Sequence, residues 1–247
     1  MSVDGRAPAS TARTTALASD HIDLELPGAC VRFTTRAGGV SDGPYTSLNL
    51  GRWTDDDRAA VAENRRRAGE GRPLGFGRQV HGTTVLTLDA PTAEDAVADA
   101  DGVATAAHGV AALVLTADCL PVALATPGAV AMVHAGWRGL ADGVLEAGVA
   151  AVRALDPERA IHAAIGPAAG ACCYEVGDEV AALFGDEPRR ADRTIDLKAI
   201  AARRLRAAGV GEVCDVGRCT MCEPGVFFSH RASGPVTGRQ GGLAWRS

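Results

Sequence analysis

Three short apolar segments that follow one another closely constrain the fold of this chain more than any other feature. They cover Val110–Thr116, Pro121–Thr126 and Val130–His134 and are separated by turn-forming residues. Apolar runs of this length, without polar alternation, are typical of strands that are buried on both faces of a sheet. We therefore predict that the three segments form buried, neighbouring strands.

Helical and strand-like patterns are interleaved along the rest of the chain. Capping residues and the helical spacing of apolar side chains predict four helices, over Asp55–Gly69, Arg138–Leu155, Asp178–Phe184 and Asp196–Ala208. Further strands are predicted over Val31–Arg36, Thr83–Leu88, Ile161–Ile165, Val213–Val216, Phe227–His230 and Leu243–Trp245. Because the elements do not follow a strict βαβ order, we expect an α+β (mixed α/β) fold with mixed β-sheets flanked by helices.

The chain contains one stretch that differs clearly from the rest in composition. The first twenty residues are rich in Ala, Ser and Thr, and we predict a mobile N-terminal tail over residues 1–20. No linker-like stretch divides residues 21–247, which we predict to form a single compact catalytic domain.

Composition argues against several functional classes. The 247 residues carry a net charge of −5, whereas domains that bind nucleic acid usually have a basic excess. No apolar run approaches the roughly 20 residues that span a bilayer, and no apolar segment marks a secretory signal. We therefore expect no nucleic-acid or membrane partner and a cytoplasmic location. Seven cysteines, an odd number, indicate reduced thiols that can serve as ligands, nucleophiles or core residues.

Three segments place a metal-binding side chain where a strand is expected to end. His81, Cys119 and His134 lie in the segments RQVHG, TADCLP and VHAGWRG. Zinc accepts imidazole nitrogen and thiolate sulfur, and a catalytic zinc ion keeps three protein ligands and one open position. The set is therefore a candidate zinc site. Two alternatives stay open at this point, namely buried residues of the core and a Cys119 nucleophile activated by a neighbouring histidine.

Two arginines are candidates for binding an anion. Arg138 lies in a glycine-flanked turn at the start of a predicted helix, where backbone amides attract anions and the guanidinium fits phosphate or carboxylate. Arg36 precedes the turn formed by Gly38 and Gly39. Either side chain could instead face water. Arg231 and Arg239, near the C-terminus, could line a cleft.

The remaining cysteines suggest at most a weak structural site. Cys219 and Cys222 form a C-x₂-C pair with Cys214 upstream, but no second pair or histidine pair accompanies them. Cys172 and Cys173 are adjacent in sequence, which we expect to place them poorly for chelating one ion together. We predict that these two residues pack in the core.

Several longer motifs occur in a consistent order and together resemble a known family. They are FTTRAGGVSDGPYTSLNLG at Phe33–Gly51, VAENRRR, RQVHG, TADCLP, VHAGWRG, CCYEVG, FFSHR and TGR. From about Pro27 to the C-terminus the chain resembles the YfiH-like family, formerly labelled multicopper polyphenol oxidoreductase or laccase-domain. That family is now described as purine nucleoside phosphorylase with accessory adenosine deaminase activity.

The resemblance implies a role for each candidate residue. It implies that zinc is held by His81, Cys119 and His134, which are thereby catalytic. It further implies that Arg36 and Arg138 belong to the substrate pocket and that Asp118 handles protons. The implied substrates are a purine nucleoside and inorganic phosphate.

The chain departs from the family pattern in two places. Ala169 and Ala171 replace Ile and Pro in the pattern GPxIGPCCYEVG. His230, Ala232 and Ser233 stand where FFSYRRDG is common, so we expect substrate contacts near the C-terminus to differ in detail.

Four functional hypotheses follow. The first is a zinc-dependent purine nucleoside phosphorylase, acting on adenosine, inosine, guanosine or methylthioadenosine, with adenosine deaminase activity. The second is a cysteine-dependent amide hydrolase that edits peptidoglycan precursors, with Cys119 as nucleophile. A copper polyphenol oxidase is the third, and it is disfavoured because multicopper chemistry needs more histidine ligands than two. The fourth is a metal-binding or partner-binding module without enzymatic activity.

Overall fold

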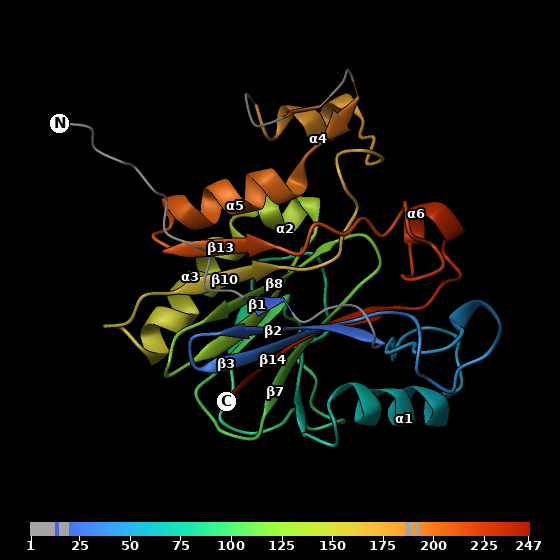
Figure 1. Ribbon diagram of the computed structural model, residues 1–247, viewed down its shortest axis with the longest axis horizontal. Coiled ribbons are helices and arrows are strands. Elements are labelled where there is room, and N and C mark those ends of the chain that lie inside the picture. Colours follow the sequence, from blue (N-terminus) through green and yellow to red (C-terminus); the bar gives the residue numbers. More distant parts are fainter. Residues whose placement is uncertain (1–12, 15–19, 186–188, 191–192) are drawn as a thin grey trace.

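Two six-stranded sheets form the framework of the protein (Figure 1). The computed structural model describes residues 13–14, 20–185, 189–190 and 193–247. The strand order of the first sheet is β1 (Arg13–Thr14), β2 (His21–Leu26), β3 (Ala29–Thr34), β14 (Gln240–Arg246), β7 (Ala111–Thr116) and β4 (Leu74–Gly75). The order of the second is β13 (Glu212–Asp215), β10 (His162–Ile165), β8 (Leu120–Ala125), β9 (Val130–Ala135), β6 (Gly102–Thr105) and β5 (Val85–Thr87). A small separate sheet pairs β11 (Arg189–Arg190) with β12 (Thr194–Ile195).

Both large sheets are mixed. The pairs β4–β7, β5–β6 and β10–β13 are parallel, and the other pairs in the two sheets are antiparallel. One apolar cluster, which includes Phe33, Val114, Ala123 and Met132, contains side chains from both sheets and lies between them. The predicted α+β fold with mixed sheets and flanking helices is confirmed.

Helices cover the framework on two sides (Figure 1). On the outer face of the second sheet lie α2 (Trp137–Asp142), α3 (Val144–Leu155) and α5 (Leu197–Ala207). On the other side of the molecule lies α1 (Arg58–Ala68), whose Ala68 joins a cluster on the outer face of the first sheet. Two short helices, α4 (Asp178–Ala182) and α6 (His230–Ser233), and a 3-10 turn at Gly43–Tyr45 complete the elements of the described residues.

The central strands of the second sheet are buried on both faces. In β8, Val122 and Leu124 pack toward the helices, whereas Ala123 and Ala125 pack toward the first sheet. A strand in this position needs apolar residues at every position, which explains the uninterrupted apolar runs in the sequence. The three predicted central strands are confirmed as β7, β8 and β9, although β7 belongs to the opposite sheet.

The helix predicted over Asp55–Gly69 forms, with a later start. It begins at Arg58 because the Asp57 carboxylate accepts a hydrogen bond from the Ala60 amide, which satisfies one of the unpaired N–H groups of the first turn. Arginines in the last turn and Gly69 at the end complement the helix dipole and close the helix as expected.

The prediction of a single helix over Arg138–Leu155 is wrong in one respect, because the structure has two helices there. Gly143 adopts φ = 97°, ends α2 and begins α3. Few residues other than glycine adopt this left-handed conformation, so the chain turns there and two helices result. The predicted apolar stripe is still buried, with Leu145, Val149 and Val152 packed against the second sheet.

The strand predicted over Phe227–His230 does not form. Its apolar residues are buried, but the side-chain amide of Gln240 takes the place of a partner strand. Gln240 Oε1 accepts from the Phe228 amide at 2.8 Å, and Nε2 donates to the Phe228 carbonyl at 3.0 Å. The chain then enters α6, capped by the Ser229 hydroxyl.

The first residues of the domain form a strand that was not predicted. In β2 the residues Ile22, Leu24 and Leu26 are buried, in the alternating pattern of a strand with one face against the core. Most of the predicted mobile tail over residues 1–20 lies outside the described residues, and its mobility stays a prediction. Arg13–Thr14 form β1 and pair with β2. Among the helices of the described ranges, none is long and apolar enough to cross a membrane.

Close packing of the two sheets generates a stability prediction at Gly242. A Cβ atom there would lie 2.8 Å from Pro121 Cβ and 2.9 Å from Met132 Sδ, both in the opposite sheet. We expect Gly242→Ala to lower the free energy of unfolding by about 1–3 kcal/mol because the core is overpacked. Chemical denaturation measures this change. Gly225→Ala, where the new methyl group would meet nothing within 4 Å, is the matched control, and equal effects of both variants would contradict the packing argument.

Candidate functional site

The register of two antiparallel strands brings Cys119 and His134 together. Leu120 at the start of β8 lies opposite Ala135 at the end of β9. Cys119 immediately precedes β8, and His134 is the residue before Ala135, so both lie at the same edge of the second sheet. Residues 15 positions apart in sequence are thus neighbours because a hairpin joins them.

A carboxylate that was not predicted lies at the same edge. Strand β6 is antiparallel to β9, with Gly102 opposite Val133, so Asp101 lies opposite His134. Asp101 is fully buried. Its backbone carbonyl accepts from the His134 amide at 2.6 Å, which continues the pairing of the two strands by one residue.

The Asp101 carboxylate organises the third segment, which carries His81. Oδ1 accepts from His134 Nδ1 at 2.7 Å and from the His81 amide at 3.0 Å. Oδ2 accepts from the amides of Val80 at 3.1 Å and Gly82 at 2.7 Å. His81 has φ = 60°, a conformation that costs free energy for a residue other than glycine. Three hydrogen bonds from consecutive amides to one buried carboxylate offset that cost.

These contacts bring the three predicted ligands together. One ligand atom from each of His81, Cys119 and His134 lies within 4.8 Å of the others. An ion with bonds of roughly 2.0–2.3 Å can therefore be reached by all three. Gly136 makes room for them, because a Cβ atom there would lie 2.9 Å from His81 Cδ2 and 3.2 Å from Cys119 Sγ.

The electrostatics of this cluster favour an ionised thiol. Desolvation would raise the pKa of Cys119, but the charge of His134 and hydrogen bonds from His134 and His81 outweigh it and lower the pKa to about 6. Burial would lower the pKa of His134, but the Cys119 thiolate and the hydrogen bond to Asp101 raise it to about 9. The thiol and the imidazole thus stabilise each other as a charged pair.

The cluster opens into a cavity of about 360 Å³. The lining comes from loops and strand ends of both sheets and consists of Gly51, Trp53, Thr54, Gln79, His81, Leu115, Thr116, Ala117, Cys119, His134, His230 and Arg239. The Gln79 amide group exchanges two hydrogen bonds with the backbone of Leu115, at 2.7 and 2.8 Å, and so ties the His81 segment to β7. Cavities of this size hold small-molecule ligands in many proteins.

Asp118, expected to handle protons, is engaged elsewhere. Its Oδ1 accepts from the Thr220 hydroxyl at 2.6 Å and its Oδ2 from the Arg231 amide at 2.7 Å. Its backbone, with φ = 99°, is also held by the Ala169 amide, which donates to the Asp118 carbonyl at 2.9 Å. These bonds fix the turn that presents Cys119.

The two arginines expected in the pocket lie outside the cavity lining. Arg36 donates to the carbonyls of Thr46 and Pro224 and lies over the Phe228 ring. Arg138 is exposed and lies over the neighbouring Trp137 ring, 4.4 Å from its centroid. Their role in substrate binding stays a prediction.

Arg239 is the arginine that lines the cavity. Its Nη1 donates to the carbonyls of Thr237 and Gly238, at 2.8 and 2.9 Å, which fixes the guanidinium in the wall. Its amide donates to Asn49 Oδ1 at 2.8 Å. Burial lowers the pKa of Arg239 below its usual range, an effect that the negative charges of Cys119 and Asp118 oppose.

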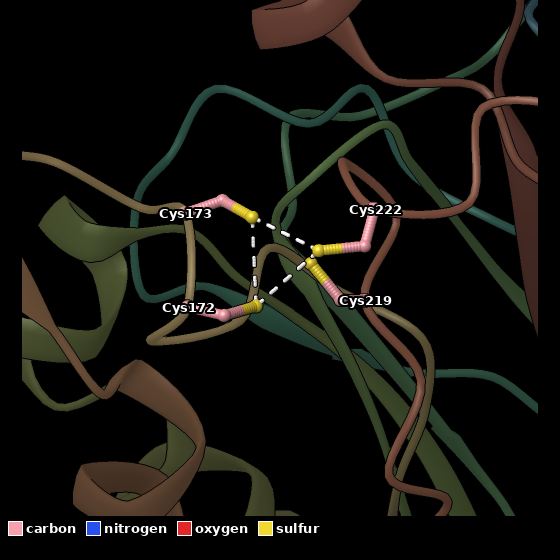
Figure 2. Close-up of side chains that lie close together, drawn as sticks. All are labelled: Cys172, Cys173, Cys219 and Cys222. Atoms are coloured by element: carbon pink, nitrogen blue, oxygen red, sulfur yellow. Dashed lines mark hydrogen bonds between the residues drawn. The ribbon is translucent and has the colours of Figure 1, made fainter.

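The prediction that Cys172 and Cys173 pack in the core is wrong. Cys172 is exposed and Cys173 is half-buried, and their sulfurs lie 3.4 and 3.0 Å from that of Cys222 (Figure 2). With Cys219 they form a second group of four potential ligands, all within 4.8 Å of one another. Cys214 is not a member of this group and packs beside the core instead. All seven cysteines are free.

Sequence reasoning missed Asp101, the residue that joins His81 to His134. The only signal is an acidic residue directly before the four-residue segment GVAT, which was not predicted to be a strand. A short strand containing glycine gives no clear pattern, and its pairing with β9 is a long-range property. Arg239 was noted as a possible cleft residue, but nothing in the sequence placed it ahead of Arg36 or Arg138.

Comparison with known proteins points to the same family as the sequence motifs. The sequence profile of the family described as "Multi-copper polyphenol oxidoreductase laccase" matches residues 30–247. A Pseudomonas aeruginosa protein named purine nucleoside phosphorylase is 42% identical over 233 residues, which cover 88% of this chain and 92% of that protein.

Solved structures show the same fold. A crystal structure of a Neisseria meningitidis protein superposes with a TM-score of 0.83 at 37% identity and covers 93% of this chain and 100% of that one. The Bacillus licheniformis protein YfiH superposes with a TM-score of 0.84 at 27% identity, over 95% and 99% of the two chains. The chain therefore belongs to the multi-copper polyphenol oxidoreductase laccase family, which confirms the resemblance that its motifs indicate.

Proposed function

We propose that the protein is a zinc-dependent purine nucleoside phosphorylase that also deaminates adenosine. The observation that carries this proposal is the convergence of His81, Cys119 and His134 in the wall of an open cavity large enough for a nucleoside. The name of the Pseudomonas aeruginosa relative supports the phosphorylase activity.

The donor set fits zinc. Two imidazoles and one thiolate are ligands that a catalytic zinc ion uses. Asp101 binds Nδ1 of His134, which leaves Nε2 for a metal, and a carboxylate of this kind commonly orients a histidine ligand. Bound there, zinc supplies a Lewis acid that lowers the pKa of a water molecule or polarises a substrate atom. Two histidines are fewer than multicopper chemistry requires, so copper is the less suitable metal.

The cavity wall offers side chains that can bind phosphate and side chains that can bind the purine. The fixed guanidinium of Arg239 suits inorganic phosphate, which a planar donor fork binds well. Trp53 lines the cavity with its side chain half exposed and offers an aromatic face to a purine. His230 lies in the same lining and can carry a proton to the departing base.

The two reactions differ in the atom that is attacked. In phosphorolysis a phosphate oxygen bonds to the anomeric carbon of the ribose, the glycosidic bond breaks, and the purine leaves with a proton. In deamination water adds to the purine carbon that carries the exocyclic amine, and ammonia leaves. Asp118, whose carboxylate is held by Thr220 and Arg231, we assign to positioning Cys119, and its expected part in proton transfer stays a prediction.

The direct test is a product assay. We expect the purified protein, given inosine or adenosine with phosphate, to release the free base and ribose-1-phosphate, and a chelator to abolish this activity until zinc is restored. Adenosine alone should give inosine and ammonia. Absence of all these products from zinc-loaded protein would reject the proposal.

Arg239→Lys tests the phosphate site. Lysine keeps the charge but loses the planar fork, and we expect the KM for phosphate to rise about tenfold or more, the effect of losing one charge-assisted hydrogen bond. Steady-state kinetics at varied phosphate measure this. Arg36→Lys and Arg138→Lys, assayed in the same way, show which arginine contacts phosphate, and Arg66→Lys on the exposed face of α1 is the control. An unchanged KM in Arg239→Lys contradicts the assignment.

One observation favours a second candidate, a cysteine-dependent amide hydrolase. Cys119, His134 and Asp101 lie in the order nucleophile, base and orienting carboxylate, and the pKa of the thiol is lowered to about 6. This hypothesis predicts stoichiometric alkylation of Cys119 in metal-free protein that is active. Activity that follows zinc content instead, with Cys119 protected from alkylation by zinc, favours the phosphorylase.

Asp101→Asn is expected to disrupt the whole ligand set. An amide accepts fewer hydrogen bonds than a carboxylate, so His134 Nδ1 and the amides of residues 80–82 cannot all keep their partner. We expect zinc affinity to fall by about 10–100-fold, the usual effect of removing a group that orients a ligand. Calorimetric zinc titration measures this. Asp99→Asn, two residues away and exposed in an ion pair with Arg78, should leave the affinity unchanged.

A further inference from the structure

Four cysteines from two distant segments meet in one group (Figure 2). Cys172 and Cys173 lie in the loop between β10 and α4, and Cys219 and Cys222 lie in the loop between β13 and α6. We propose that these four thiolates bind one zinc ion in a second, structural site, separate from the site at Cys119. The proposal is independent of the proposed activity.

The spacing of the sulfurs fits a single ion. In a tetrahedral site with zinc–sulfur bonds of about 2.3 Å, neighbouring sulfurs lie roughly 3.8 Å apart. Here the Cys172 and Cys222 sulfurs are 3.4 Å apart, those of Cys172 and Cys173 are 3.5 Å apart, and all four lie within 4.8 Å of one another. Small side-chain movements bring them to the tetrahedral spacing.

Other arrangements of four thiols fit less well. The Cys172 and Cys173 sulfurs lie 3.4 and 3.0 Å from the Cys222 sulfur. These distances exceed the covalent S–S length of about 2.05 Å, so the four thiols are not paired as disulfides. A polynuclear iron–sulfur cluster places several irons and sulfides between its cysteines and needs a wider cage than 4.8 Å. A tetrahedral set of four sulfurs around one ion is a preferred zinc environment.

The backbone explains how two adjacent cysteines can face one ion. Gly170 O accepts from the amides of Cys173 and Tyr174, at 3.0 and 2.9 Å, and so forms a tight turn around Cys172. This turn directs both sulfurs to the same side (Figure 2). The Gly170 amide also donates to Cys219 Sγ at 3.3 Å, a hydrogen bond that stabilises a thiolate.

The site would tie together the loops that hold the Cys119 turn. Thr220, inside the C-x₂-C pair, donates through its hydroxyl to Asp118 and through its amide to the Ala168 carbonyl. From the other loop, Ala169 donates to the Asp118 carbonyl. An ion that clamps both loops therefore stabilises the backbone that presents Cys119. Structural zinc sites contribute directly to folding stability in this way.

Metal content of single variants tests the proposal. We expect the purified protein to contain about two zinc ions per chain. The variants Cys222→Ser and Cys172→Ser should each contain about one zinc ion, because each substitution removes a ligand of the structural site. His81→Ala should also fall to about one, through loss of the other site. Cys214→Ser, a cysteine in the same region but outside the group, should keep both. Elemental analysis of each protein gives these numbers.

A second measurement needs no cysteine variant. His81→Ala, stripped of metal and loaded with Co²⁺, should show the intense thiolate-to-cobalt absorption of a site with four sulfurs, and Zn²⁺ should displace it and raise the melting temperature. Absorption typical of one thiolate overturns the proposal. So do Cys222→Ser and Cys172→Ser proteins that hold as much zinc as the wild type, iron in place of zinc, or mass spectrometry that finds a disulfide among the four cysteines of the purified protein.

Discussion

The buried carboxylate of Asp101 is the constraint on which the rest of the site depends. It lies where β6 meets β9 and receives four hydrogen bonds, one from the His134 ring and three from consecutive amides around His81. A buried charge is costly unless it is paired and fully hydrogen-bonded. The same bonds that stabilise this carboxylate hold His81, in an otherwise irregular segment, in a left-handed conformation. The two histidines are thereby oriented toward Cys119 by one group.

The sheet supplies the remaining geometry. Because β8, β9 and β6 are antiparallel neighbours, the start of one strand lies beside the end of the next, and residues far apart in sequence meet at one edge. The β7–β8 connection then carries Cys119 from the first sheet to the second. The lowered pKa of its thiol and the raised pKa of His134 are consequences of this forced proximity.

The sequence predicted those parts of the protein that are determined locally. The apolar runs of β7–β9, the capped helix α1 and the three candidate ligands follow from patterns within a few residues. Asp101, the cysteine group and the cavity position of Arg239 depend on which strands pair and how loops turn, which no local pattern shows. The adjacent residues Cys172 and Cys173 are an instructive error, because the turn closed by Gly170 aligns side chains that an extended chain would separate.

The cavity lies between strand ends of the two sheets. Cys119 and His134 project from the edge of the second sheet, whereas Thr116 and Arg239 belong to the ends of β7 and to the entry of β14 in the first. Any molecule that fills this space touches both halves of the framework at once. A bound ligand therefore links the two sheets and raises the free energy of unfolding, so that the stability of the protein depends on the ligand as well as on the polypeptide.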